Sequence, residues 1–231
     1  MSYLIRSLHI HRIDMLLAAA MLLSYPLSNA LPSTWGAENG PIENAQVAVL
    51  LSGCLAALLV WRRQRGRPPA MLALGTVPVW LILAARELSW GAVVLQADAI
   101  RAGRPLAPLW YQPAVAPAIC AGLACSLVLV WRRQLGGFLL QILCRGHFAL
   151  VPLLLAITAS YFSACAEGHA VCGVQAAPHH AEVWEEMLEL LAYAALVIAQ
   201  YLVLQACQGY VAKDEPLPVE EGEAVGPTRN P

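Results

Sequence analysis

The chain has 231 residues, of which 59% are hydrophobic and only 13% are Asp, Glu, Lys or Arg. Its formal net charge is -1, which lacks the strongly basic balance typical of proteins that bind nucleic acid. Long runs rich in Leu, Ala and Val take up most of the length and leave no room for a soluble domain. The composition therefore predicts a protein that crosses a membrane several times and is surrounded by membrane lipid.

The apolar runs are typical of membrane helices rather than of barrel strands. A helix needs about 20 apolar residues to cross the hydrocarbon core, whereas barrel strands are short and alternate in polarity. Six runs follow in chain order, at about residues 13–31, 45–61, 70–95, 113–131, 146–165 and 182–207. Residues 135–144 predict a short helix in the membrane interface. We expect an all-α fold, a polytopic membrane helical bundle with six transmembrane helices within residues 1–212.

Arginines near the ends of these runs predict the orientation, because cytoplasmic loops carry an excess of basic residues. The outward loops hold only Arg101 and Arg104. The other side holds nine arginines, at positions 6, 12, 62, 63, 65, 67, 132, 133 and 145. This distribution predicts that both termini are cytoplasmic. In a bacterium, the protein would lie in the inner (plasma) membrane with its outward loops in the periplasm.

The two ends of the chain need separate interpretation. Arg6 and Arg12 precede an apolar stretch, and Ser28-Asn29-Ala30 is an acceptable cleavage site, so residues 1–30 are compatible with a cleaved signal peptide. We favour an uncleaved anchor, because the apolar run is long and Pro26 interrupts its end. Residues 213–231 are acidic and rich in proline, and are expected to form a disordered cytoplasmic tail.

Two of the seven cysteines lie in an expected outward loop. Cys165 and Cys172 are close in sequence, and an oxidising periplasm favours a disulfide between them. The alternative is a metal site formed by both thiolates and His169. The other cysteines lie in or at the ends of apolar runs, where small, inert core residues are expected.

Charged residues inside a membrane helix are costly and invite a functional hypothesis. Arg86 and Glu87 interrupt the third run, sixteen residues beyond Ala70. At 1.5 Å per residue this is roughly 24 Å along the helix, in the outer part of the bilayer. Adjacent helix positions point about 100° apart, so each of the two side chains is expected to have its own partner.

Two other segments bring polar side chains to the same depth. Glu43, Asn44 and Gln46 follow a turn signal at the start of the second run. The sixth run begins with an acidic stripe at helical spacing, which Tyr193 continues one turn deeper: Glu182, Glu185, Glu186 and Glu189.

These positions predict a polar site facing the periplasm. Its centre is expected at Glu43, Arg86, Glu87 and Glu189, as catalytic or other functional groups. The expected substrate-binding residues around that centre are Asn44, Ser89, Trp90 and Glu185. The outward side has nine carboxylates against three arginines, which suits a cation, a proton relay or a metal. The alternative is structural: Arg86 pairs with Glu43 or Glu189 and fixes which helices pack together.

Histidines offer a second candidate. His179 and His180 precede the acidic stripe, and His180 with Glu186 could ligate zinc or a similar ion. The alternative is that both histidines lie in a polar surface loop. The chain has no Gly-rich phosphate loop, nucleophile elbow or His-Glu-x-x-His motif. We expect no cofactor, with a divalent metal such as zinc as the alternative, and no nucleic-acid partner.

Two stretches resemble motifs of a loose group of small bacterial multi-pass membrane proteins. They are Glu38-Asn-Gly-Pro-Ile-Glu43-Asn and Arg86-Glu-Leu-Ser-Trp-Gly91, and Glu185-Glu186-x-x-Glu189 is similar to the start of the last helix in that group. The resemblance implies a shared site. A fainter similarity is to the alkaline ceramidase-like membrane hydrolases, whose zinc is held by membrane histidines. Here the spaced His pair inside a late helix is missing.

The leading expectation is a non-enzymatic membrane component, such as an accessory, assembly or small-solute-handling protein, which could have a protein partner in the membrane. The first alternative is a metal-dependent hydrolase acting on a lipid or lipid-linked substrate, with Arg86 holding a phosphate or oxyanion. The second is a proton- or cation-coupled transporter in which Glu189 titrates.

Overall fold

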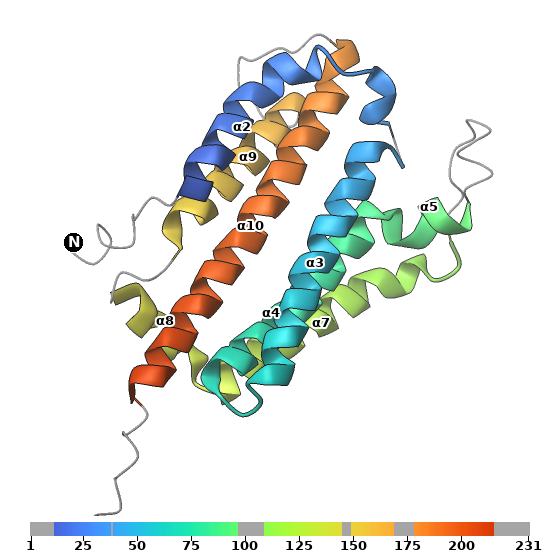
Figure 1. Ribbon diagram of the computed structural model, residues 1–231. Helices are drawn as coiled ribbons and strands as arrows, with labels where there is room; N and C mark the ends of the chain where they lie inside the picture. The colour runs from blue at the N-terminus through green and yellow to red at the C-terminus, as the bar shows by residue number, and fades with distance from the viewer. Residues whose placement is uncertain (1–11, 38, 97–108, 145–148, 169–177, 215–231) are drawn as a thin grey trace, which may run out of the picture.

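The computed structural model describes residues 12–37, 39–96, 109–144, 149–168 and 178–214, and these residues form helices, turns and loops without a strand. The chain is all-helical, as predicted. Its elements are α2 (Arg12–Ser28), η1 (Ser33–Trp35), α3 (Pro41–Arg63), α4 (Pro68–Glu87), η2 (Ser89–Gly91), α5 (Ala92–Leu95), α7 (Gln112–Arg132), α8 (Leu135–Cys144), α9 (Leu150–Ala166) and α10 (Pro178–Asp214) (Figure 1).

Four of the described helices are long and apolar enough to cross a membrane: α3, α4, α7 and residues His180–Cys207 of α10. The apolar helix α9 has 17 residues, and α2 also has 17. At 1.5 Å per residue, 17 residues span about 25 Å, slightly less than a hydrocarbon core of about 30 Å. The structure thus supports a membrane protein with four candidate spans, and the six-span topology stays a prediction.

Helix α10 is the central element of the bundle. It packs against α9, α3, α2 and α4, while α4 also packs against α3 and α7. Figure 1 shows α2 and α9 on one side of α10, and α3, α4 and α7 on the other. Buried clusters fill both contacts, one around Leu50, Trp80 and Tyr193, the other around Leu17 and Ala195. Residues far apart in sequence therefore meet on the faces of one long helix.

The end of α4 differs from the sequence prediction. The third run was expected to stay helical to about residue 95, but α4 ends at Glu87. Ser89, Trp90 and Gly91 have φ of 45°, 56° and 88°, which a right-handed helix cannot accommodate. The Tyr111 hydroxyl donates to the Trp90 carbonyl over 2.5 Å and so satisfies one group released by this turn. Arg86 and Glu87 therefore lie in the last turn of the helix rather than in its interior.

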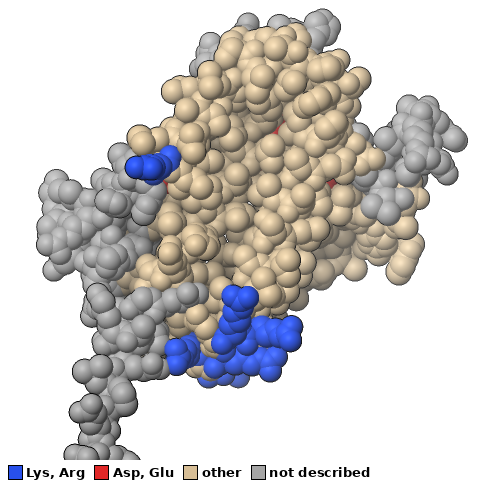
Figure 2. Space-filling model, viewed as in Figure 1, with Lys and Arg blue, Asp and Glu red and all other residues tan. Residues whose placement is uncertain are grey.

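Basic side chains gather at the opposite end of the bundle. The α3–α4 connection holds Arg65 and Arg67, and Arg62 and Arg63 occupy the last turn of α3. Figure 2 shows the basic patch at this end and one further basic group apart from it, while most of the other visible described surface carries no charge. A positive end next to an apolar belt is the pattern expected of a membrane protein at its cytoplasmic side.

Candidate functional site

The last turn of α4 meets the first half of α10 through four polar side chains, which we call the Arg86 cluster: Arg86, Glu87, Glu189 and Tyr193. Arg86 Nη2 lies 3.1 Å from Glu189 Oε1, in a hydrogen-bonded ion pair. Arg86 Nη1 donates to the Tyr193 hydroxyl over 3.3 Å and lies 3.8 Å from Glu87 Oε1. The Tyr193 hydroxyl donates to Glu87 Oε1 over 2.7 Å. Three of the four residues predicted for the centre of the site are thus in contact.

Helical spacing explains how this cluster forms. Glu189 and Tyr193 are four residues apart and therefore share one face of α10. Arg86 occupies the last turn of α4, where a cation is favoured by the helix dipole. The prediction that Arg86 and Glu87 have separate partners was wrong, because a hydroxyl both accepts and donates. Tyr193 therefore contacts both side chains at once.

Exposure differs sharply across the cluster. The side chain of Glu87 is 7% exposed and that of Glu189 is 17% exposed, whereas that of Arg86 is 57% exposed. The guanidinium therefore has one edge against the two carboxylates and one edge open to the surroundings. A charged group with an open edge is least costly beside water or headgroups, as expected for the predicted position in the outer part of the bilayer.

A second polar contact joins α3 to α10 nearby. Gln46 is fully buried, and its Nε2 donates to Glu186 Oε2 over 2.7 Å and to the Glu186 carbonyl over 2.9 Å. Gln46 Oε1 is buried and has no hydrogen-bond donor in the described structure. From α9, the Ser163 hydroxyl lies 3.5 Å from Glu189 Oε1. Four helices, α3, α4, α9 and α10, therefore contribute polar groups to one end of the bundle.

Glu43 and Asn44, near the start of α3, contact the two residues just before that helix. The Glu43 carboxylate accepts the Asn39 N–H, and Asn44 Nδ2 donates to the Gly40 carbonyl over 2.8 Å. Both contacts hold the turn that leads into α3, and the Gly40 carbonyl also accepts the Asn44 N–H. Glu43 also lies close enough to Glu87 for their charges to interact. Their predicted roles in the site stay predictions.

The remaining predicted site residues are more scattered. Ser89 and Trp90 lie in the turn after α4, and Glu185 lies on α10 next to Glu186. His180 is in the first turn of α10 rather than in a loop, and its Nδ1 is buried without a hydrogen-bond partner in the described structure. Among the described residues, no group of three or more His, Cys, Asp or Glu side chains is placed to hold a metal ion. The zinc site at His180 and Glu186 stays a prediction.

The cysteines fall into different environments. Cys165, in the last turn of α9, is disulfide-bonded, and its predicted partner Cys172 lies outside the described residues. Cys54 and Cys207 are free and buried, as expected of core residues. Cys120 and Cys125 are free but exposed on α7, so the expectation that they are core residues was wrong. The reason is that α7 packs along α4 and buries none of its own residues.

Sequence reasoning missed a polar contact deeper in the bundle, which we call the Gln200 junction. Gln200 Oε1 accepts from Trp80 Nε1 over 2.5 Å and from the Thr76 hydroxyl over 2.8 Å. Gln200 Nε2 donates to the Gly53 carbonyl over 3.0 Å. The amide thus links α3, α4 and α10. The signal in the sequence was an uncharged amide within the sixth apolar run, where only charged residues had been considered as site candidates.

No protein-family model, curated protein or solved structure matches this chain. The resemblance to motifs of small bacterial membrane proteins therefore stays a prediction.

Proposed function

We propose that this chain is a six-span protein of a bacterial inner membrane, with both termini in the cytoplasm, and that its periplasmic end binds a small cation. In this proposal α2 and α9 complete the bundle as the two shorter spans, because both pack lengthwise on α10. The basic patch at the α3–α4 end faces the cytoplasm. The polar end then faces the periplasm, and the role is small-solute handling rather than catalysis.

The observation that carries the proposal is an imbalance of charge. Glu87, Glu186 and Glu189 act on one another electrostatically, and the guanidinium that contacts this group belongs to Arg86. Carboxylates near a low-dielectric membrane need a cation, a hydrogen bond or a proton. Arg86 contacts Glu87 and Glu189, whereas Glu186 accepts from the neutral amide of Gln46, which leaves its negative charge without a cation among these contacts.

The contact between Glu186 and Gln46 provides the matching ligand chemistry. Gln46 Nε2 already donates to the Glu186 carboxylate, so the amide oxygen Gln46 Oε1 is next to that charge. This oxygen is buried, and no donor reaches it from the described residues. Carboxylate and amide oxygens together suit a hard cation or the N–H groups of a protonated amine. A cation bound there would balance Glu186 and satisfy Gln46 Oε1 at once.

The test is the thermal stability of the detergent-purified protein at constant ionic strength. Sodium, potassium and methylammonium chloride are each titrated against N-methyl-D-glucamine chloride, a bulky reference cation. A ligand at 100 times its Kd stabilises the folded state by about 2.7 kcal/mol, so a cation that fits raises the Tm with concentration.

Variants connect that response to the site. Glu186→Gln is expected to abolish the rise in Tm. Glu182→Gln, an exposed carboxylate on the same helix, is the matched control and should keep it. Equal Tm values in all four salts, or a rise that survives in Glu186→Gln, would refute cation binding at this site.

A further inference from the structure

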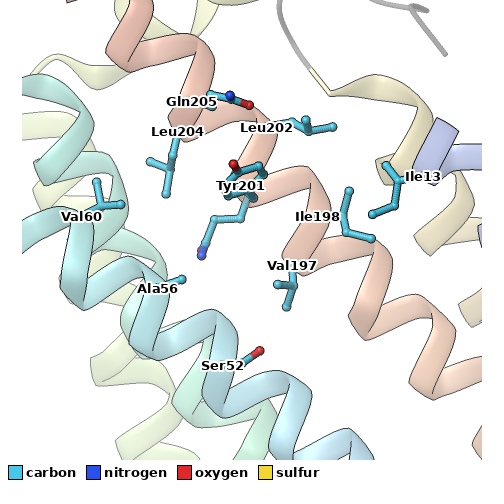
Figure 3. Close-up of a pocket in the computed structure, with 11 residues that line it drawn as sticks. Ile13, Ser52, Ala56, Val60, Val197, Ile198, Tyr201, Leu202, Leu204 and Gln205 are labelled. Atoms are coloured by element: carbon cyan, nitrogen blue, oxygen red, sulfur yellow. The ribbon is translucent and has the colours of Figure 1, made fainter. Parts of the chain in front are cut away.

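An apolar groove lies between α10, α3 and the start of α2, away from the Arg86 cluster. Its volume is about 580 Å³, and its walls include Ala56 and Val60 of α3, Val197 and Leu204 of α10, and Ile13 of α2. Figure 3 shows these side chains around an open space between the helices. From Ser52 to Val60 the groove follows α3 for about 12 Å. It is therefore an elongated space, suited to a chain-like apolar ligand.

Basic side chains stand at one end of this groove. Val60 is followed by Arg62 and Arg63 in the last turn of α3, and both arginines are exposed. On the opposite wall, Ile13 follows directly after Arg12, which is also exposed. Positive charge therefore follows the stretch of α3 that lines the groove, and a further arginine precedes the lining residue of α2.

A second cavity provides the contrast. It has a volume of about 390 Å³, lies between α2, α9 and α10, and is lined by Tyr25, Phe162, Trp184 and Leu188 among others. This cavity belongs to the end of α10 that carries Glu182, Glu185 and Glu186. Both cavities are apolar, but the charge beside them has opposite sign.

We infer that the groove between α2, α3 and α10 binds one acyl chain of an anionic phospholipid, whose phosphate is held by Arg62 and Arg63. Lipid tails are as apolar as Leu, so an apolar groove alone would not favour one lipid over another. The preference has to come from the headgroup, and basic residues on the cytoplasmic side recognise anionic headgroups. Tyr201 and Gln205 also line the groove and offer hydrogen-bond donors beside the chain.

The experiment is native mass spectrometry of the purified protein with phosphatidylglycerol or phosphatidylcholine of the same acyl composition. The first phosphatidylglycerol molecule is expected to bind at least 10-fold more tightly than the first phosphatidylcholine. Arg62→Gln/Arg63→Gln should remove that preference. Arg132→Gln/Arg133→Gln is the matched control, because it changes the same Trp-Arg-Arg-Gln sequence at the end of α7, away from the groove, and should retain the preference.

A second pair of variants tests the groove itself. Ala56→Phe fills it and should abolish tight binding of either lipid, whereas Ala48→Phe, on an exposed part of the same helix, should not. If Ala56→Phe does not fold, the two double arginine variants test the inference without it. The inference would be overturned by equal affinity for the two lipids or by an equal loss of the lipid preference in both double arginine variants. Undiminished lipid binding in a folded Ala56→Phe would also overturn it. So would binding of no lipid at all, as expected if another segment of the chain fills the groove.

Discussion

The Arg86 cluster and the Gln200 junction both connect α4 to α10, but with opposite chemistry. The first uses a guanidinium and two carboxylates at the end of α4. The second uses one amide, an indole and a hydroxyl. Tyr193 and Gln200 are seven residues apart on α10, or about 10 Å. The charged groups lie at the end of α4, where the Arg86 side chain is partly exposed. Neutral groups form the contact deeper in the bundle, where an ion could not be hydrated.

The two contacts should also differ in what their loss costs. Hydrogen bonds between membrane helices contribute on average about 0.6 kcal/mol and at most about 1.7 kcal/mol. Removing one partner of a buried ion pair costs about 3–5 kcal/mol, because the other charge stays buried and uncompensated. The ion cluster is therefore the more sensitive of the two to single substitutions.

The largest effect is expected for Arg86→Leu. This change leaves Glu87 and Glu189 without their cation, and since Arg86 is half exposed we expect a loss of about 2 kcal/mol rather than the full buried-pair cost. The free energy of unfolding in mixed detergent micelles measures it. Adding Glu87→Gln and Glu189→Gln to Arg86→Leu should restore most of the stability. A triple variant less stable than Arg86→Leu would contradict this electrostatic explanation.

An intermediate effect is expected for Gln200→Leu. The substitution removes three hydrogen bonds and leaves Trp80 Nε1 and the Gly53 carbonyl without that partner. We expect a loss of about 1.5 kcal/mol in the same unfolding assay. Gln205→Leu, an exposed amide on the same helix, is the control and should change stability little. If both substitutions had the same effect, the Gln200 junction would not stabilise the bundle.

The smallest effect is expected for Tyr193→Phe. It removes the hydroxyl between Arg86 and Glu87 but leaves the charge pairs in place, so a loss of about 0.6 kcal/mol follows. A double-mutant cycle with Glu87→Gln should show that the two changes are coupled. Tyr201→Phe, whose side chain is exposed, is the control. Additive effects of Tyr193→Phe and Glu87→Gln would exclude an energetically significant bond between them.

Several features of this protein could be read from its sequence. Long apolar runs predict helices because lipid provides no hydrogen bonds to the backbone, and the part of the chain that the structure describes is all-helical. Charged residues within those runs predicted a set of Glu43, Arg86, Glu87 and Glu189, and the last three are in contact, since ions in a membrane must meet a partner. Residues 135–144 also form the short helix α8 that was expected.

Other features depended on the tertiary structure alone. The end of α4 at Glu87 is set by positive φ at Ser89 and Trp90, residue types that give no sign of it. The hydrogen bonds from Gln46 to Glu186 and from Ser163 to Glu189 join helices that are far apart in sequence.

The difference has one physical cause. Composition determines whether a segment is helical and apolar, and charge determines where an ion has to find a partner. Lipid and protein interior are equally apolar, so hydrophobicity does not determine which face of a membrane helix meets which neighbour. Helices α7 and α10 are both apolar, yet α7 lies at the edge of the bundle and α10 at its centre. Side-chain packing alone sets the position of each helix in the bundle, and that position determines which polar groups come into contact.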